Sequence, residues 1–232
     1  MVIAVPVLSA TIAPVIEYPS SDGEPVAETY DHFYAIAVLL EMLRQYLTGR
    51  LATVLGNQFL YYSQGMPRMR VAPDVMVIFD VAAGGRDNYK IWEEGQVPVV
   101  VFEMTSKSTQ FVDTGFKRDL YTQMGVKEYW LFDPKDEWLG GQLQGYRLNG
   151  HEKGDEYVAI ADGVSQELGL RLSVENKKIA LYRLDNGEKL PFPEELAEQV
   201  TRERQAKQEA EAAKLEAEAL LQRYRDRYGD LE

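Results

Sequence analysis

The segment VPVVVFEMTSKST, residues 97–109, is typical of a β-strand in the middle of a sheet, yet it contains an acid. Val99 to Phe102 are apolar on both faces of the strand, and Glu103 follows them directly. An ionised carboxylate in dry surroundings is costly unless a partner neutralises it or it takes up a proton. The segment therefore predicts a buried strand and a partner for Glu103.

The residues that follow complete a unit of strand, helix and strand. Residues 113–124, DTGFKRDLYTQM, place Phe116, Leu120 and Met124 at four-residue intervals, which predicts a helix. Gly125 is a helix stop, and residues 126–134, VKEYWLFDP, form a second strand. Because a crossover of this length usually joins parallel neighbours, we expect the two strands to pair in parallel.

The segments before residue 97 predict a long helix and several strands. The helix begins near Glu28 and Thr29, after a turn at residues 22–23. Its expected apolar face consists of Phe33, Ile36, Ala37, Leu40, Leu43 and Leu47. Residues 52–63 and 70–81 are rich in β-branched and aromatic residues, which favours strands. Residues 82–98 are rich in glycine and charge and predict a loop.

The C-terminal part predicts a meander and then a helix. Residues 140–190 alternate short apolar segments with turn pairs, which indicates an antiparallel meander. From Pro193 onward nearly every residue is a good helix former. The best stripe on this tail is Leu196, Gln199, Glu203, Ala206, Ala210, Ala213, Ala217, Leu220 and Tyr224. It is too small and polar for a strong coiled coil, so a solvated helix and weak self-association both stay open.

Together these elements predict an α/β (α+β) fold, with a mixed β-sheet flanked by helices, an antiparallel meander and a C-terminal helical tail. The 232 residues suffice for one sizeable core. We expect an N-terminal extension over residues 1–20, one domain over 21–190 and the helical tail over 191–232.

Composition narrows the classes of function. The formal charge of −12 disfavours non-specific binding to nucleic acid, although a cation held by carboxylates reverses the sign locally. The chain has no cysteine, which excludes disulfides and thiolate nucleophiles. A secretory signal requires a positively charged leading region, but no Lys or Arg precedes Arg44. No stretch is apolar enough to span a membrane. We expect a cytoplasmic protein without membrane contact.

Two further acids stand where Glu103 could meet them. Asp74 follows Pro73 at the head of the strand VMVIF, and Glu28 lies at the start of the long helix. If the strands of Asp74 and Glu103 are neighbours, both carboxylates can project from one face of the sheet, and Glu28 can reach them from a helix packed there. Such a cluster repels itself unless a cation neutralises it. Without cysteine or clustered histidine, the oxygen ligands favour Mg²⁺, Mn²⁺ or Ca²⁺ over zinc.

A lysine near such a metal would complete a hydrolytic site. Lys117, one helical turn after Asp113, is the first candidate, and Lys107, four residues after Glu103, is its rival. Ordinary structural roles compete with these assignments. Asp74 could serve only a turn, Glu28 only the helix dipole, and Lys117 with Asp113 only an exposed ion pair.

Other polar residues give weaker indications. His32, one turn after Glu28, could orient that acid, contact substrate or merely pack beside the helix, and His151 lies among turn residues. Arg68 and Arg70 could contact phosphate or be solvated. The sequence contains no nucleophile elbow, phosphate-binding loop or dinucleotide fingerprint.

The order of these residues resembles the Uma-type family of restriction-endonuclease-like proteins, within the PD-(D/E)XK nuclease superfamily. The resemblance covers about residues 20–190. Its motifs are DGEPVAET with a following H, APDVMV, VVFEMTSKST, a D…K…Y set at 113, 117 and 121, GV at 125 and EYWLFDP. The resemblance implies a restriction-endonuclease-like fold. It also implies that Asp74 and Glu103 bind Mg²⁺ or Mn²⁺, that Lys117 supplies the catalytic lysine and that Glu28 assists.

The sequence departs from the superfamily pattern at two places. Thr105 stands where the superfamily usually has lysine, and Lys107 stands where relatives often have proline. The hydroxyls of Ser106, Ser108 and Thr109 still match and are expected to cap the turn after the strand or to hold water on the metal.

Two classes of function follow from the sequence. The first is a divalent-metal-dependent endonuclease that hydrolyses DNA with a metal-activated water, and by resemblance a homodimer. The second is a catalytically inactive module of the same fold that serves protein–protein interaction or assembly, with a partner bound through the C-terminal helix or the meander. A hydrolase of another substrate that uses two carboxylates as acid and base would leave Lys117 without a role.

Overall fold

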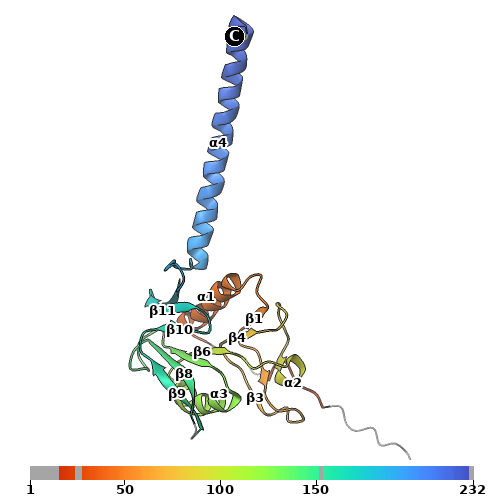
Figure 1. Ribbon diagram of the computed structural model, residues 1–232, viewed down its shortest axis with the longest axis vertical. Helices are drawn as coiled ribbons and strands as arrows, with labels where there is room; N and C mark the ends of the chain where they lie inside the picture. Colours follow the sequence, from red (N-terminus) through yellow and green to blue (C-terminus); the bar gives the residue numbers. More distant parts are fainter. Residues whose placement is uncertain (1–15, 24–27, 152–153, 230–232) are drawn as a thin grey trace, which may run out of the picture.

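The computed structural model describes residues 16–23, 28–151 and 154–229. Figure 1 shows a body of mixed sheets and helices from which one long helix projects. Most of the N-terminal extension expected over residues 1–20 lies outside the described residues.

The largest sheet is mixed and has six strands in the order β1-β4-β6-β7-β8-β9. Its strands are β1 (Ala52–Leu55), β4 (Val75–Phe79), β6 (Val100–Met104), β7 (Glu128–Phe132), β8 (Leu143–His151) and β9 (Gly154–Ile160). Strands β6 and β7 are parallel, and the other neighbours in this sheet are antiparallel. The predicted parallel pair and the mixed sheet are thereby confirmed, and β6 lies between β4 and β7 with all five of its residues buried.

The two faces of this sheet carry different partners. Phe102 and Met104 belong to a core shared with α1 (Tyr30–Tyr46), whereas Val101 belongs to a core shared with Tyr121. Because side chains alternate along a strand, Glu103 points to the same face as Val101. Asp74 precedes β4 by one residue and has the parity of Met76, which lies in that same core. The expectation that the long helix packs on the face of the acids is therefore wrong, since α1 covers the opposite face.

Helix α1 begins where the sequence predicted. Thr29 is its N-cap and accepts a hydrogen bond from the backbone N–H of His32. The expected apolar face is partly wrong, because Phe33 is 61% exposed whereas Leu39 and Met42 are buried. The buried stripe is thus rotated from the one predicted, toward residues that meet both the large sheet and the small C-terminal sheet.

The segment 82–98 is not only a loop. It contains β5 (Tyr89–Lys90) and the single-turn helix α2 (Ile91–Glu94). Strand β5 pairs in parallel with β2 (Leu60–Tyr61), which also pairs with β3 (Arg70–Val71). The loop prediction fails because these short elements depend on pairing with residues about thirty positions earlier.

The connection between β6 and β7 is a helix with two geometries. A π-helix, η1 (Val112–Lys117), continues into α3 (Arg118–Met124), and Gly125 ends it in the left-handed conformation, as predicted. The predicted apolar repeat is wrong at Phe116, which is 60% exposed, while Asp113 is buried. The wider π turn rotates the acid toward the sheet in place of the aromatic ring.

The predicted meander is confirmed, but it is divided between two sheets. Strands β8 and β9 extend the large sheet, and β10 (Val164–Ser165), β11 (Leu170–Glu175) and β12 (Lys178–Arg183) form a separate antiparallel one. His151 is therefore the last residue of a strand and not a turn residue. Helix α4 (Pro193–Tyr228) projects from the body and buries none of its residues (Figure 1). Within the described ranges, no helix is both long and apolar enough to cross a membrane.

Glu128 is a structural acid. It is fully buried at the start of β7, and Arg147 Nη2 lies 3.1 Å from its Oε1. Its carboxylate also accepts hydrogen bonds from the Gln166 backbone N–H, at 2.8 Å, and from the Ser165 hydroxyl. These contacts connect β7 to β8 and to the small C-terminal sheet.

The pairing of β7 with β8 provides a test of this packing. Gly145 lies opposite Trp130, and a Cβ at position 145 would come within 2.4 Å of the indole ring. We predict that Gly145→Ala lowers the free energy of unfolding by about 1–3 kcal/mol through overpacking. The measurement is urea unfolding, and Gly140→Ala is the matched control because, apart from its chain neighbours, no described residue lies within 4 Å of its Cβ position. Equal stability of the two variants would contradict this packing.

Candidate active site

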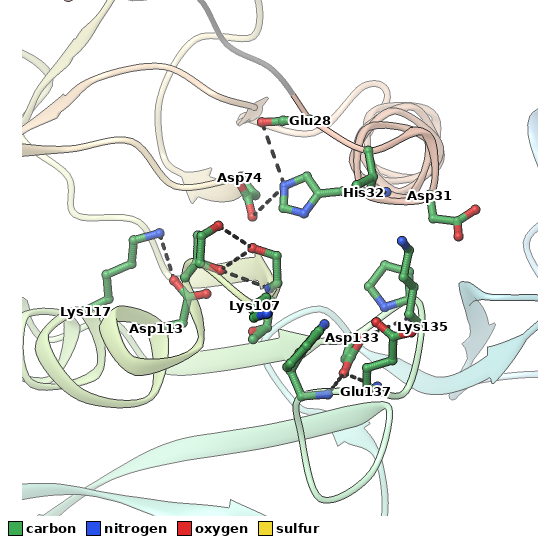
Figure 2. A pocket seen from close by; sticks show the side chains of 17 residues that line it. Glu28, Asp31, His32, Asp74, Lys107, Asp113, Lys117, Asp133, Lys135 and Glu137 are labelled. Atoms are coloured by element: carbon green, nitrogen blue, oxygen red, sulfur yellow. Dashed lines mark hydrogen bonds and ion pairs between the residues drawn. The ribbon is translucent and has the colours of Figure 1, made fainter.

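A cavity of about 760 Å³ opens at the carboxyl ends of β6 and β7 (Figure 2). Its walls come from the start of α1, the turn after β6, the η1 helix and the loop after β7. The acidic and basic residues lining it are Glu28, Asp31, His32, Asp74, Lys107, Asp113, Lys117, Asp133, Lys135 and Glu137. Parallel strands that end beside a helix commonly form such sites, because side chains from several elements meet there.

Asp74 and Glu103 are brought together by the pairing of β4 with β6. The register places Val75 opposite Phe102, so the residue before β4 lies beside the end of β6. Asp74 Oδ2 accepts a hydrogen bond from the Met104 backbone N–H at 2.6 Å, and the Asp74 N–H donates to Glu103 Oε2 at 3.4 Å. Glu103 is fully buried beneath the cavity, whereas Asp74 lines it. The predicted adjacency of the two strand acids is therefore confirmed.

Lys117 is the partner that the buried Glu103 requires. Its Nζ lies 2.8 Å from Glu103 Oε2 and 3.1 Å from Asp113 Oδ1, so it is held between two buried carboxylates. Asp113 Oδ2 has no hydrogen-bond partner among the described residues. The pair of Asp113 and Lys117 is thus not the exposed ion pair that the sequence left open. Lys107, the rival lysine, instead lies 5.9 Å from the ring of Trp138.

Tyr121 completes the surroundings of Glu103. Its hydroxyl donates to Glu103 Oε1 at 2.6 Å from within the core beneath α3. Both oxygens of Glu103 are therefore engaged, one by Tyr121 and the other by Lys117. A charge-assisted hydrogen bond of this kind fixes the orientation of the carboxylate.

Glu28 reaches the strand acids only through His32. Its Oε1 lies 3.8 Å from His32 Nε2, which in turn lies 3.9 Å from Asp74 Oδ2 (Figure 2). The side-chain amide of Asn57 also donates to Glu28 Oε1, at 3.4 Å. Helix α1 lies on the other face of the sheet, so its first turn approaches Asp74 around the end of the strands. The interpretation that His32 could orient Glu28 agrees with this geometry.

Burial dominates the protonation of the strand acids. It raises the pKa of Asp74 to about 6, against the opposing charge of Lys117 and the hydrogen bond from Met104. It likewise raises the pKa of Glu103 to about 8, although Lys117 acts in the opposite direction. The carboxylate of Asp113 also raises the pKa of both acids, so Lys117 is the one nearby cation for three acids among the described residues.

The bases of the site respond in opposite ways. Burial alone would lower the pKa of Lys117, but Glu103, Asp113 and Asp74 outweigh it and raise that pKa, so the ammonium stays charged. Burial lowers the pKa of His32, although Glu28, Asp113 and Glu103 act against it. At neutral pH the imidazole is therefore neutral, and it can donate or accept a hydrogen bond beside Asp74.

The donor set fits a cation that uses few protein ligands. Within the part of the chain that the structure describes, no three His, Asp or Glu side chains are arranged to hold a metal ion. Asp74 and Glu103 supply hard oxygen atoms, and burial raises the pKa of each, so a bound cation would stabilise their ionised forms. Mg²⁺ is commonly held by one or two carboxylates and completes its shell with water and phosphate oxygens. The two acids fit such a group, with Lys117 competing for Glu103 Oε2.

The turn after β6 is organised by its hydroxyls, as predicted. Ser106 N–H donates to Thr109 Oγ1 at 3.0 Å, and the Ser106 hydroxyl lies 3.0 Å from that of Ser108. All three residues line the cavity. Arg70 instead lies over the ring of Phe59, and neither it nor Arg68 lines the cavity.

Neither Asp113 nor Tyr121 was predicted from the sequence to be a functional residue. Both were visible in the D…K…Y set, whose four-residue spacing places the three side chains on one side of a helix. What the spacing could not show is that this side faces the sheet, because Phe116 offered a more conventional apolar face. The π turn settles which face is buried.

The raised pKa of Asp74 gives a prediction for pH. The folded protein retains a proton on Asp74 that the unfolded chain has already released, so stability falls as the pH rises from about 4 to about 6. We predict that metal-free wild type loses about 3 kcal/mol over this range relative to Asp74→Asn. Urea unfolding of both proteins in chelator measures the difference. Curves that run parallel from pH 4 to pH 7 would contradict the shift.

The chain matches the model of one protein family. The model of the Uma2 family, described as "Putative restriction endonuclease", matches residues 13–211. A search of curated proteins found no match.

Among solved structures, the chain is similar to a putative nuclease belonging to DUF820 from Anabaena variabilis ATCC 29413. The identity is 14%, the TM-score is 0.46, and the match covers 68% of this chain and 87% of the other. The family match spans most of the chain, including every residue of the site described above. The chain therefore belongs to the Uma2 family of putative restriction endonucleases.

Proposed function

We propose that the protein is a divalent-metal-dependent endonuclease that hydrolyses DNA phosphodiester bonds. The observation that carries this proposal is the fully buried Glu103, which joins Asp74 and Lys117 below an open cavity. The structural carboxylate of Glu128 has Arg147 as its own cation, whereas Glu103 shares Lys117 with Asp113. Three buried acids around one lysine leave a deficit of positive charge, which a metal ion can fill.

In the proposed reaction, water attacks the phosphorus, the bond to the leaving nucleotide oxygen breaks, and that oxygen takes up a proton. Asp74 and Glu103 would hold Mg²⁺ or Mn²⁺, which when bound polarises the phosphodiester and lowers the pKa of bound water. Lys117 keeps its charge and stabilises the negative charge that develops on the phosphate oxygens. Asp113 and Tyr121 position Lys117 and Glu103, and Glu28 orients His32 beside Asp74.

Membership of the family supports nuclease chemistry, and the choice of DNA as substrate is part of the proposal. A homodimer and a protein partner of α4 stay predictions. Helix α4 exposes Leu215, Leu220 and Tyr224, which leaves apolar side chains free to meet a partner.

The first test is nicking of supercoiled DNA at low salt with Mg²⁺, Mn²⁺ or chelator. We predict metal-dependent nicking by wild type and none by Asp74→Asn. Lys117→Ala should lose about 10²–10³-fold in rate, the usual cost of removing a group that stabilises transition-state charge. Lys127→Ala is the matched control, because Lys127 is exposed and outside the cavity.

Two results would count against the proposal. Normal nicking by Lys117→Ala would remove the lysine from the mechanism. Absence of nicking by wild type in every condition would favour the inactive interaction module instead.

The hydroxyl of Tyr121 provides a second test. Tyr121→Phe removes a donor to Glu103 and leaves that buried oxygen unsatisfied, which costs about 1–3 kcal/mol of stability. Tyr157→Phe is the matched control, because its hydroxyl donates to the Val126 carbonyl, also in the core. We expect both variants to lower the melting temperature but only Tyr121→Phe to slow nicking. Equal nicking rates would show that Tyr121 serves stability alone.

A further inference from the structure

We propose that the wall of the cavity formed by Trp138, Lys107 and Thr105 is a subsite for one unpaired nucleotide of the substrate. In this subsite Trp138 stacks on the base, and Lys107 and the Thr105 hydroxyl contact its phosphate. The inference rests on the proposed nuclease function, because the same cavity contains Asp74 and Lys117. In Figure 2, Lys135 and Glu137, which belong to the loop after β7, lie across the hollow from Lys117.

The loop that carries Trp138 is held by hydrogen bonds to the buried carboxylate of Asp133. Asp133 is 1% exposed just after β7, and its carboxylate accepts hydrogen bonds from four backbone N–H groups of the loop. The donors are the N–H groups of Lys135, Glu137, Trp138 and Leu139. Trp138 itself is half-buried and lines the cavity. An indole fixed in this way loses little freedom when a flat ring stacks on it.

Two lysines line the cavity together with Trp138. Lys107 Nζ lies 5.9 Å from the ring centroid of Trp138, and Lys135 lines the same wall. No carboxylate of the described residues pairs with either lysine within 4 Å, whereas Lys117 is bound by two acids. The carboxylate of Asp133 accepts hydrogen bonds from the loop N–H groups and pairs with neither lysine. Glu137 is an exposed acid on the same wall. This wall therefore offers the site's available positive charge to a phosphate.

Thr105 supplies an unused hydrogen-bond donor. Its side chain is 2% exposed, and its Oγ1 has no hydrogen-bond partner among the described residues. Thr105 N–H donates to the Phe132 carbonyl at 2.7 Å, so the extended pairing of β6 continues through this residue. The side chain therefore points to the same face as Glu103, two residues earlier, and lines the cavity. A buried hydroxyl without a partner is costly, and a phosphate oxygen would satisfy it.

The geometry selects an unpaired nucleotide. Bases inside a duplex already stack on both faces, so an aromatic side chain can stack only on a base at an end, in a gap or in a single strand. Sequence-tolerant proteins that bind single strands combine aromatic platforms with lysines in this manner. The subsite therefore predicts a preference for single-stranded or gapped DNA over intact duplex.

The test measures binding of a fluorescent oligothymidine to the full chain by anisotropy, at low salt with Ca²⁺. We expect Trp138→Ala to weaken binding at least about fivefold, the lower end of base stacking on an aromatic ring, and Trp138→Phe to retain most of it. Lys107→Ala should lower affinity and reduce the salt slope by about 0.7, as one phosphate contact requires, while Lys127→Ala changes neither. Melting temperatures verify that each variant is folded.

The outcomes separate this subsite from the nuclease proposal. Equal binding by wild type and Trp138→Ala, or no binding of single strands by wild type, would overturn the subsite. So would an equal loss of duplex and single-strand binding in Trp138→Ala. Binding that depends on Trp138 without nicking under any metal would instead overturn the nuclease proposal and leave the subsite standing.

Discussion

The contact between Lys117 and Glu103 is the constraint on which the site depends. Glu103 is fully buried at the end of a central strand, where a lone carboxylate would be expensive. Lys117 reaches it at 2.8 Å from the following helix, and Tyr121 secures the other oxygen from one turn later. The same helix thus connects β6 to β7 and neutralises the acid that β6 buries. The contacts that hold this part of the fold together therefore also position the residues of the site.

The π turn explains how one short helix meets both needs. A regular helix through residues 112–124 would favour the apolar face of Phe116, Leu120 and Met124. The wider turn exposes Phe116 and buries Asp113 beside Lys117, so that two acids hold one ammonium. Asp113 gains an ion pair on one oxygen, and its other oxygen has no hydrogen-bond partner among the described residues. Such turns are often found at functional sites, which agrees with its position in the wall of the cavity.

Much of this could be predicted from local patterns. The apolar run before Glu103 indicated a central strand, and the strand-helix-strand unit indicated a parallel pair, because both depend on residues close in the chain. The adjacency of Asp74 and Glu103 followed once their strands were neighbours.

Features that depend on distant contacts could not be predicted in the same way. The face covered by α1, the pairing of β5 with β2 and the rotation of the helix at Phe116 are decided by tertiary packing. The position of Glu28 follows the same rule. His32 lies between Glu28 and Asp74, because α1 lies on the opposite face of the sheet. Trp138 belongs to a loop whose backbone is ordered by Asp133, and neither residue formed a pattern that periodicity detects.

The measurement that tests the central claim most directly is titration of Mn²⁺ into the protein, followed by the electron paramagnetic resonance of the free ion. If Glu103 and Asp74 share a cation, wild type binds Mn²⁺ and Glu103→Gln loses at least about tenfold in affinity, since one of two charged ligands becomes neutral. Undiminished binding by Glu103→Gln would contradict the account, because the buried carboxylate would then serve only its ion pair with Lys117.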